Sequence, residues 1–301
     1  MNQGTRPHYR MDLLLAQTIA NGLLIGAIYG LAALGLTLVW GIMDVVNLAH
    51  GEFVLFGAYL TFVLFSQRGA LGGVNPLLSL LMVVPAGLLF GAFLYRALLQ
   101  RVVGQPALTT LLLTFGLSIL FNNVLLNWFG PDVRIVRWAQ GSLVVGGVAL
   151  PWTRLIAFAL VIVVALCLFV FLQRSYAGKA IRAVMQDAEA AAALGIDTQR
   201  VLTTAFAVGT MLAMVAGVLV SVALSFSPAN GVQFSVTSFV ICVVGGLGRP
   251  LGAMMGGIIV GLVESFTGVF ITQAYTPAMV SLLLIGFLLV RPVGLFGMAE
   301  R

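Results

Sequence analysis

The sequence carries very little charge. Of its 301 residues, 15 are basic and 9 are acidic, together 8% of the chain, whereas an ordinary soluble domain carries about 25%. Apolar residues make up 61%, and the mean hydropathy is +1.12. A water-soluble globule could not hide so much apolar surface, so lipid must cover the excess. No stretch is polar enough for a soluble domain, and the sequence predicts a single transmembrane domain over residues 1–301.

Cysteine and nucleotide-binding motifs are scarce as well. Cys167 and Cys242 each lie in an apolar run without neighbouring His or acidic residues, which suits neither a zinc site nor a disulfide framework. No G-x-x-x-x-G-K-[ST] occurs, so the chain has no phosphate-binding loop of this type. No nucleophile, base and orienting group stand together in the sequence. We therefore predict no catalytic residue, no metal site and no cofactor bound by this chain.

The net charge of +6 has a topological explanation. The basic residues stand singly or in small groups between apolar runs, as the positive-inside rule expects, and we predict no nucleic-acid partner. The basic gaps at 96–105 and 173–200 and the C-terminal tail are predicted to be cytoplasmic. Alternation then places four gaps outside: 67–76, 128–151, 225–235 and 271–277. Three arginines near the predicted outer side do not follow the positive-inside rule: Arg134, Arg137 and Arg154.

Apolar runs dominate the rest of the chain. They cover 12–46, 52–66, 77–95, 107–127, 152–172, 201–224, 236–247, 252–270 and 278–290. A helix needs about 20 residues to cross the hydrocarbon core. The first run fits one strongly tilted helix or two spans, and two spans would also place the basic N-terminus inside. The short run at 236–247 predicts a half-span. We therefore predict an all-α polytopic bundle of about 8–10 spans, one of them broken or re-entrant, with ten favoured.

The longest polar stretch is 173–200. Its core is rich in alanine, with Arg182, Asp187 and Glu189, which predicts short helices. Gly178 stands near its start and Gly195 near its end, and both suit a turn or a helix C-cap. The stretch is interpreted either as a solvated loop or as a surface that docks on another protein.

Four polar residues interrupt an apolar region early in the chain: Asp44, Asn47, His50 and Glu52. An ionisable group in a membrane is costly unless it faces the bundle interior or water. Breaks in the backbone at such depth are tolerated only where protein or a cavity satisfies the freed groups. Two interpretations stay open: a cytoplasmic turn between spans, or a substrate-facing element. His50 suits a structural hydrogen bond better than a proton relay.

Glu264 lies inside the run at 252–270. Gly257, Gly261 and Glu264 have helical spacing and share one face, and small residues mark close helix packing. Glu264 should therefore face protein, where it contacts the amino group of a zwitterionic substrate or hydrogen-bonds a neighbouring helix. Two further glycine rows are expected to pack against other helices: Gly22, Gly26 and Gly30, and Gly248, Gly252 and Gly256.

Several motifs resemble those of ABC-importer permeases. Glu189-Ala190-Ala191, followed after three residues by Gly195, matches the EAA…G segment that forms the coupling helix of those permeases, although the later I-x-L-P part is absent. Over nearly the whole chain the sequence is similar to the LivH-type permease subunits of branched-chain amino acid ABC importers. The matching elements are Asn21–Gly30, Ala33–Thr37, Asn47–Glu52, Gly57–Tyr59, the R-A-x-x-x-D…LGI pattern at Arg182, Asp187 and Leu194–Ile196, Gly245–Gly257, and Arg291–Gly297.

This resemblance implies a permease subunit in the bacterial inner membrane, not an enzyme. The implied partners are a LivM-like second permease subunit, two ABC ATPase subunits that bind ATP and Mg, and a periplasmic amino-acid-binding protein. The implied ATPase-coupling residues are Gly178, Arg182, Asp187, Glu189, Ala190, Ala191, Leu194 and Gly195. The candidate translocation-path residues are Asn47, His50, Glu52 and Glu264.

Two questions stay open at this point. Related permeases carry leucine-like amino acids, urea or short amides, and the sequence does not separate these substrates. The alternative function is a gradient-driven secondary transporter or channel for a small solute. In that case Asp44, His50, Glu52 and Glu264 would form a proton path.

Overall fold

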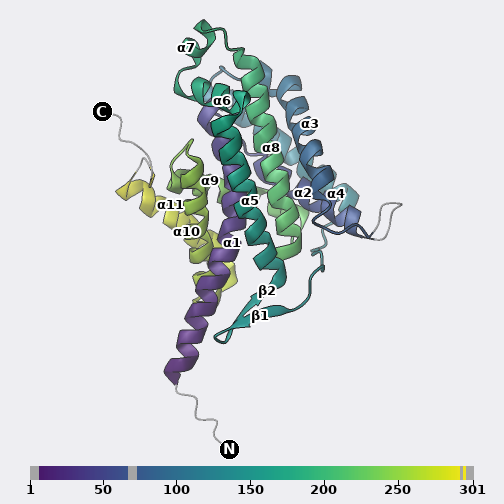
Figure 1. The fold of residues 1–301 in the computed structure, drawn as a ribbon, viewed down its shortest axis with the longest axis vertical. Helices are drawn as coiled ribbons and strands as arrows, with labels where there is room; N and C mark the ends of the chain where they lie inside the picture. The colour runs from purple at the N-terminus through teal and green to yellow at the C-terminus, as the bar shows by residue number, and fades with distance from the viewer. Residues whose placement is uncertain (1–6, 67–72, 292–293, 296–301) are drawn as a thin grey trace, which may run out of the picture.

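The computed structural model describes residues 7–66, 73–291 and 294–295, and the RPVGLFG element therefore lies partly outside the described residues. Figure 1 shows a bundle of α-helices with one small β-hairpin. The elements are α1 (Pro7–Met43), α2 (His50–Phe65), α3 (Leu80–Ala97), η1 (Leu99–Arg101), α4 (Ala107–Phe129), β1 (Ser142–Val145), β2 (Val148–Pro151), α5 (Trp152–Arg174), α6 (Tyr176–Gln186), α7 (Ala188–Ala193), α8 (Thr198–Ala223), η2 (Pro228–Asn230), α9 (Gly231–Gly245), α10 (Pro250–Phe270), η3 (Gln273–Tyr275) and α11 (Thr276–Val290).

The described residues confirm the predicted helical membrane bundle. Seven helical segments are long and apolar enough to cross a membrane, one of them formed by η3 and α11 together (Gln273–Val290), and α2 and α9 are shorter apolar helices. The short run at 236–247 is indeed part of a 15-residue helix, α9, and α2 has only 16 residues. Each of these two helices is shorter than the roughly 20 residues that a span requires.

The first apolar run forms one helix. α1 is continuous over 37 residues, so the two-span alternative for this run was wrong, and with it the argument for ten spans. No proline or charge interrupts the run after Asp12 as far as Met43, and α1 is apolar on every side, which is typical of a helix buried in the centre of a bundle. Ile28, Leu31 and Ala33 are fully buried.

The bundle has two distinct ends, which lie at the top and bottom of Figure 1. We call them the α6–α7 end and the hairpin end. Gln17 of α1 donates to the Ala149 carbonyl of β2 and accepts from the Ala149 N–H, both at 2.8 Å. The N-terminal part of α1 therefore lies at the hairpin end. A two-span first run would have placed it at the α6–α7 end, with the basic stretch at 173–200.

The sequence did not reveal the hairpin. β1 and β2 pair antiparallel, and Gly146 and Gly147 between them have φ values of 58° and 88°. Two successive positive φ values define the turn type that best joins twisted strands. Arg134 and Arg154, which violate the charge rule, both have partners: Arg134 donates to the Phe129 carbonyl at 2.6 Å, and Arg154 donates to Asn21 at 2.9 Å.

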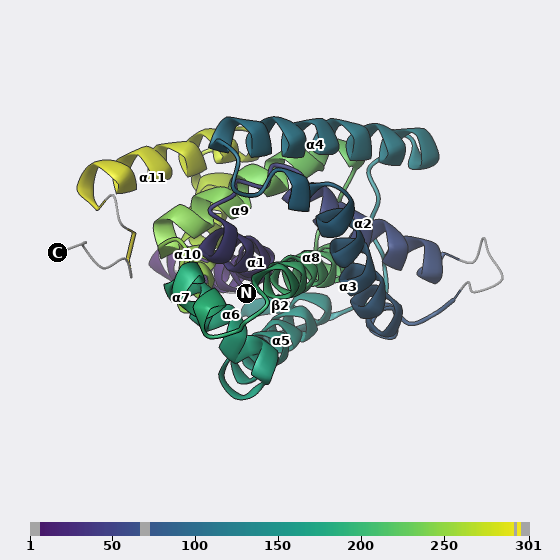
Figure 2. The same ribbon diagram turned by 90° about the horizontal axis from the view of Figure 1, so that it is seen from above.

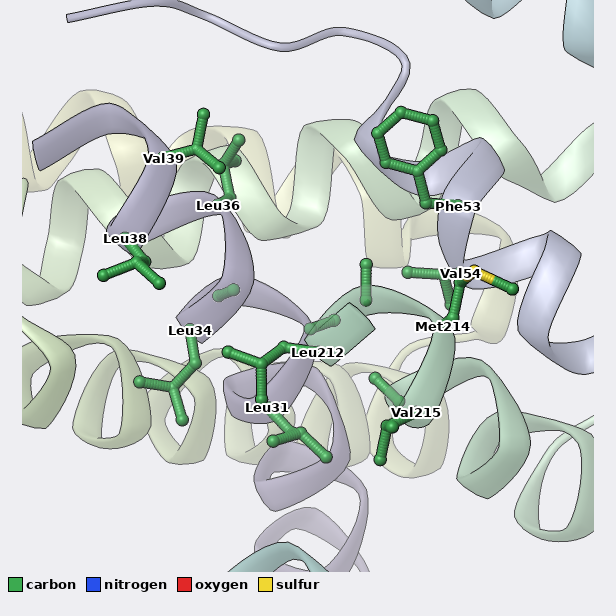
Figure 3. Close-up of a cluster of buried hydrophobic side chains, with 14 of the residues drawn as sticks. Leu31, Leu34, Leu36, Leu38, Val39, Phe53, Val54, Leu212, Met214 and Val215 are labelled. Atoms are coloured by element: carbon green, nitrogen blue, oxygen red, sulfur yellow. The ribbon is translucent and has the colours of Figure 1, made fainter. Parts of the chain in front are cut away.

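The core lies where α1, α2 and α8 meet. Figure 3 shows Leu31 and Leu34 of α1 close to Leu212 of α8, with Phe53 and Val54 of α2 beside Met214 and Val215. Seen from above, α4 and α11 lie along one flank and α5 along the opposite flank (Figure 2). α11 and α4 are among the least buried of the long helices. Their apolar faces suit lipid or another membrane chain.

The predicted glycine rows pack helices against each other. A Cβ on Gly26 would lie 2.6 Å from the Gly257 carbonyl oxygen and 2.9 Å from the Ile258 Cα. Gly22 is equally close to Leu262, and the row Gly248, Gly252 and Gly256 faces α1 and α9. Since the backbones touch, these helices are held by dispersion contacts that only glycine permits.

We expect Gly26→Ala to destabilise the protein. The new methyl group must push the backbones of α1 and α10 apart, and such overpacking costs about 1–3 kcal/mol. The melting temperature of the detergent-purified protein should fall by several degrees in a fluorescence-monitored thermal scan. Gly286→Ala on α11 is the matched control, because a Cβ there meets nothing within 4 Å. An equal melting temperature for both variants would contradict the packing role.

Candidate functional site

Residues 44–49 form a non-helical segment that connects α1 to α2. Asp44 ends α1: its N–H donates to the Trp40 carbonyl at 2.9 Å, and its φ is 51°, which aspartate tolerates better than most residues. The ring of His50 bonds through Nε2 to the Ala32 carbonyl at 2.8 Å. Ala32 stands eleven residues before the end of α1 at Met43, which is roughly 16 Å along the helix axis. The chain therefore folds back into the bundle before α2 begins.

Side chains of other helices satisfy the backbone of this segment. Thr114 of α4 donates to the Val46 carbonyl at 3.1 Å. Ser235 of α9 donates to the Leu48 carbonyl and accepts from the Gly51 N–H, both at 2.7 Å. Irregular backbone at membrane depth persists only where protein replaces the missing helical bonds. Here the hydroxyl groups of Thr114 and Ser235 supply the replacement bonds.

α2 and α9 both begin at this depth and run to opposite ends. The Tyr59 ring of α2 stacks on Phe129 at the hairpin end of α4, at 4.3 Å between centroids. Cys242 of α9 lies 3.0 Å from the hydroxyl of Thr37, on the part of α1 nearer the α6–α7 end. The two short helices thus begin beside each other in the middle of the bundle. We call this place the mid-bundle junction and define it by Asn47, His50, Glu52, Gly231 and Ser235.

Glu52 occupies the centre of the junction. It lies in the first turn of α2 and is fully buried. Ser118 of α4 donates to its Oε1 at 3.3 Å, and its carboxylate packs directly on Gly231, the first residue of α9, where no Cβ would fit. A negative charge near a helix N-terminus is stabilised by the helix dipole. Glu52 receives this stabilisation from two helices at once.

Two polar atoms of the junction have no hydrogen-bond partner in the described part of the chain. They are Nδ2 of Asn47 and Oε2 of Glu52. Asn47 is 3% exposed, and its Oδ1 accepts from the Ala49 N–H at 3.1 Å. A buried polar group without a partner is costly. The junction therefore contains an unpaired donor group, Nδ2 of Asn47, and an unpaired acceptor atom, Oε2 of Glu52.

Glu264 lies apart from the other three predicted path residues. Tyr29 of α1 donates its hydroxyl to Glu264 Oε1 at 3.1 Å, so Glu264 faces protein as its spacing predicted. It lines a cavity of about 370 Å³ at the hairpin end. None of the hydrogen bonds among the described residues joins it to Asn47, His50 or Glu52.

The predicted coupling residues lie on α6 and α7 or beside them. α6 is amphipathic: Gly178 packs so closely on α5 that a Cβ would touch Leu172, whereas Arg182 is exposed. Asp187 caps α7 by accepting from the Ala190 N–H at 2.9 Å. The exposed surface of this end includes Glu189, Ala190, Leu194 and Gly195, while Ala191 is buried.

Leu194 and Gly195 form the tip that follows α7. Leu194 is 84% exposed, and Gly195 has a φ of 85° with open space around its Cα. A positive φ after the last helical residue is the usual way for a helix to end on glycine. The α6–α7 end thus presents a large apolar side chain outside the bundle.

Sequence reasoning missed Thr114 and Ser118 of α4, which bond to Val46 and Glu52. Together with Thr110 and Asn122 they recur every fourth residue and so share one helix face. Asn122 donates to the Pro228 carbonyl at 2.7 Å and holds η2 in place. This polar stripe on an apolar helix was a signal that could have located them. No comparable signal marked Ser235 or Gly231.

The chain matches known proteins over almost its full length. The family model "Branched-chain amino acid transport system / permease component" matches residues 18–291. The chain is 31% identical over 295 residues to the high-affinity branched-chain amino acid transport system permease protein BraD of Pseudomonas aeruginosa, covering 94% of this chain and 96% of the relative. It is 31% identical over 300 residues to LivH of Escherichia coli, covering 96% and 97%. LivM of Escherichia coli is 28% identical over 294 residues, covering 91% of this chain and 68% of the relative. No solved structure matches the chain.

The apolar helices, together with the family match, define a multi-pass membrane protein of the transport class. The chain belongs to the family of permease components of branched-chain amino acid transport systems. It is a permease and not an enzyme, as the sequence predicted.

The contact of Glu52 with Gly231 can be tested by a double-mutant cycle. Gly231→Ala should destabilise the protein because its methyl group displaces the carboxylate, and Glu52→Ala should remove the obstacle. We expect the two changes to be coupled by about 0.5–3 kcal/mol. Thermal scans of both single variants and the double variant measure the coupling. As a control, Glu52→Ala should be additive with Gly116→Ala, where a Cβ meets nothing within 4 Å. Additive effects for Glu52 and Gly231 would exclude their contact.

Proposed function

We propose that this chain is the transmembrane permease subunit of an ATP-driven importer for branched-chain or other aliphatic amino acids. The observation that supports this best is the match to LivH and BraD over nearly the whole of both chains. Relatives that differ mainly by substitution, without a missing or added domain, share one architecture. We place the protein in the bacterial inner membrane.

The proposed partners follow from the same relatives. LivM is similar to 91% of this chain and over 68% of its own length, which supports pairing with a second, LivM-like permease subunit across a pseudo-two-fold axis. Two ABC ATPase subunits would supply ATP and Mg, since the chain has no phosphate-binding loop. A periplasmic amino-acid-binding protein would deliver the substrate at the hairpin end.

The α6–α7 end is the proposed ATPase-docking surface. Its exposed side chains include Leu194, Glu189 and Arg182. α6 is also well placed to pass a movement into the bundle. Met185 packs against Gly41 near the end of α1, and α1 leads directly into the non-helical segment. A shift of α6 on ATP binding would therefore reach the mid-bundle junction through α1, and rigid-body movements of this kind are common in transporters.

A gradient-driven carrier is the alternative, because Glu52 and Glu264 are acidic groups inside a membrane bundle. Two features argue against a proton relay. His50 is bonded to a backbone carbonyl, and Asp44 ends α1 and is exposed. The four ionisable residues are therefore not connected to each other.

Reconstitution separates the two functions. Vesicles with this chain alone, under an imposed pH gradient or membrane potential, should not accumulate leucine, because the chain lacks an ATPase and a connected proton path. Vesicles with the second permease, the ATPases, the binding protein and ATP should accumulate it. The measurement is uptake of radiolabelled leucine. Robust gradient-driven uptake by the chain alone would overturn the importer proposal.

Gly195→Ile tests the docking surface. The branched side chain is strained at a φ of 85° and should change the direction in which Leu194 points. We expect leucine uptake per ATP hydrolysed to fall at least about fivefold (roughly 1 kcal/mol of coupling), while membrane insertion stays normal. Gly104→Ile is the matched control, since Gly104 has a φ of 87° and equally open space but lies between η1 and α4. Equal uptake ratios for the two variants would exclude docking at α7.

A further inference from the structure

The cavity beside Glu264 extends from the start of α9 toward the hairpin end. It is lined by α1, η2, α9, α10, η3, α11 and residues 224–225 after α8, and its volume is about 370 Å³. This lies within the usual range for small-molecule sites, about 300–1,000 Å³. The residues that carry the argument are Tyr29, Asn230, Phe234, Glu264, Thr276 and Pro277.

One wall of the cavity is negative. Glu264 is half-buried, and its Oε1 accepts from the buried Tyr29 hydroxyl at 3.1 Å. No basic group forms an ion pair with it among the described residues, where the one ion pair joins Arg200 to Asp197. A carboxylate that is held in place by a neutral donor and lacks a cation can bind an ammonium group.

The lining also includes Thr276 and Pro277 at the start of α11, and Asn230 directly before α9. The first N–H groups of both helices are already bonded, that of Thr276 to the Gln273 carbonyl and that of Gly231 to the Pro228 carbonyl. The charged group that the cavity offers to a ligand is therefore Glu264.

Part of the lining is apolar. Leu224, Phe234, Ala274 and Pro277 contribute carbon surface, which suits an aliphatic side chain. Urea is neutral and has no aliphatic side chain, so it would offer no charge to Glu264 and would not cover this surface.

We propose that this cavity binds the ammonium group and the side chain of an aliphatic amino acid. Glu264 and Tyr29 hold the ammonium group, and Phe234 and Leu224 contact the side chain. The proposal deepens the proposed function and rests on it: the cavity is the first site that the amino acid meets after it leaves the binding protein.

Substrate protection of an introduced cysteine tests the site directly. Ala274 lines the cavity and is exposed, so Ala274→Cys, in a Cys167→Ala background, should react with a water-soluble thiol reagent. The assay uses the assembled transporter in membrane vesicles without ATP. The probes are leucine, 4-methylpentanoate, which lacks the ammonium group, leucinamide, which lacks the carboxylate, and urea, each at millimolar concentration.

We expect leucine and leucinamide, which share the ammonium group and the side chain, to slow the labelling at least threefold, and 4-methylpentanoate and urea to slow it less than 1.5-fold. Glu264→Gln keeps the size of the side chain and its hydrogen bond from Tyr29 but should abolish protection. The matched control is Ser265→Ala, which removes a hydroxyl that donates to the Thr18 carbonyl outside the cavity, and there protection should remain. Equal protection by urea or 4-methylpentanoate, retained protection in Glu264→Gln, or no protection by leucine would each overturn the proposal.

The comparison of the four solutes in Ala274→Cys, where Glu264 is intact, keeps the test valid even if Glu264→Gln fails to fold. Failure of the site is also distinguishable from failure of the importer function. ATP-dependent leucine uptake without protection at Ala274→Cys would exclude the cavity alone. Protection without any ATP-dependent uptake would retain the site and exclude the proposed energy source.

Discussion

Water is absent from the interior of a membrane, so every break in a helix must be repaired by other groups of the protein. The arrangement at the mid-bundle junction follows from this constraint. The non-helical segment before α2 places backbone carbonyls and a carboxylate deep in the bundle, and hydroxyls of α4 and α9 satisfy the carbonyls. The carboxylate of Glu52 lies at the N-termini of two helices, whose dipoles stabilise its negative charge. α9 thus stabilises the non-helical segment before α2 through Ser235, and Glu52 of α2 in turn stabilises the start of α9.

The arrangement at the mid-bundle junction also depends on close contact between helix backbones. α1 is in contact with α10 through facing glycines, and α9 packs on α10 in the same way. The strength of such contacts depends on shape, since lipid is as apolar as the side chains and gives no hydrophobic advantage to helix association. The glycine pairs hold α9 close to α1, and this is the position from which Ser235 reaches the non-helical segment.

The sequence predicted the class of fold and the glycine rows, because hydropathy and helical spacing are local properties. It also predicted that Glu264 faces protein, since that follows from its spacing to Gly257 and Gly261. It left open whether the first apolar run forms one helix or two, and it did not predict that α2 begins in the middle of the bundle. Both depend on contacts between distant parts of the chain, such as that of His50 with Ala32. The contact between Glu52 and Gly231 could not be predicted for the same reason, because a glycine in a sequence does not indicate which residue packs against it.

The distance in sequence between the two short helices has a consequence for biosynthesis. α2 enters the membrane early, with Glu52 at its start, but α9 belongs to the last quarter of the chain. Until α8 and α9 have been inserted, Glu52 lacks Gly231 as a neighbour, and the segment before α2 lacks Ser235. An apolar helix of 16 residues with a carboxylate near its start is a poor membrane span on its own. During synthesis, therefore, the start of α2 lacks its partners until α9 has been made, and such incomplete packing is typical of the folding intermediates of larger proteins.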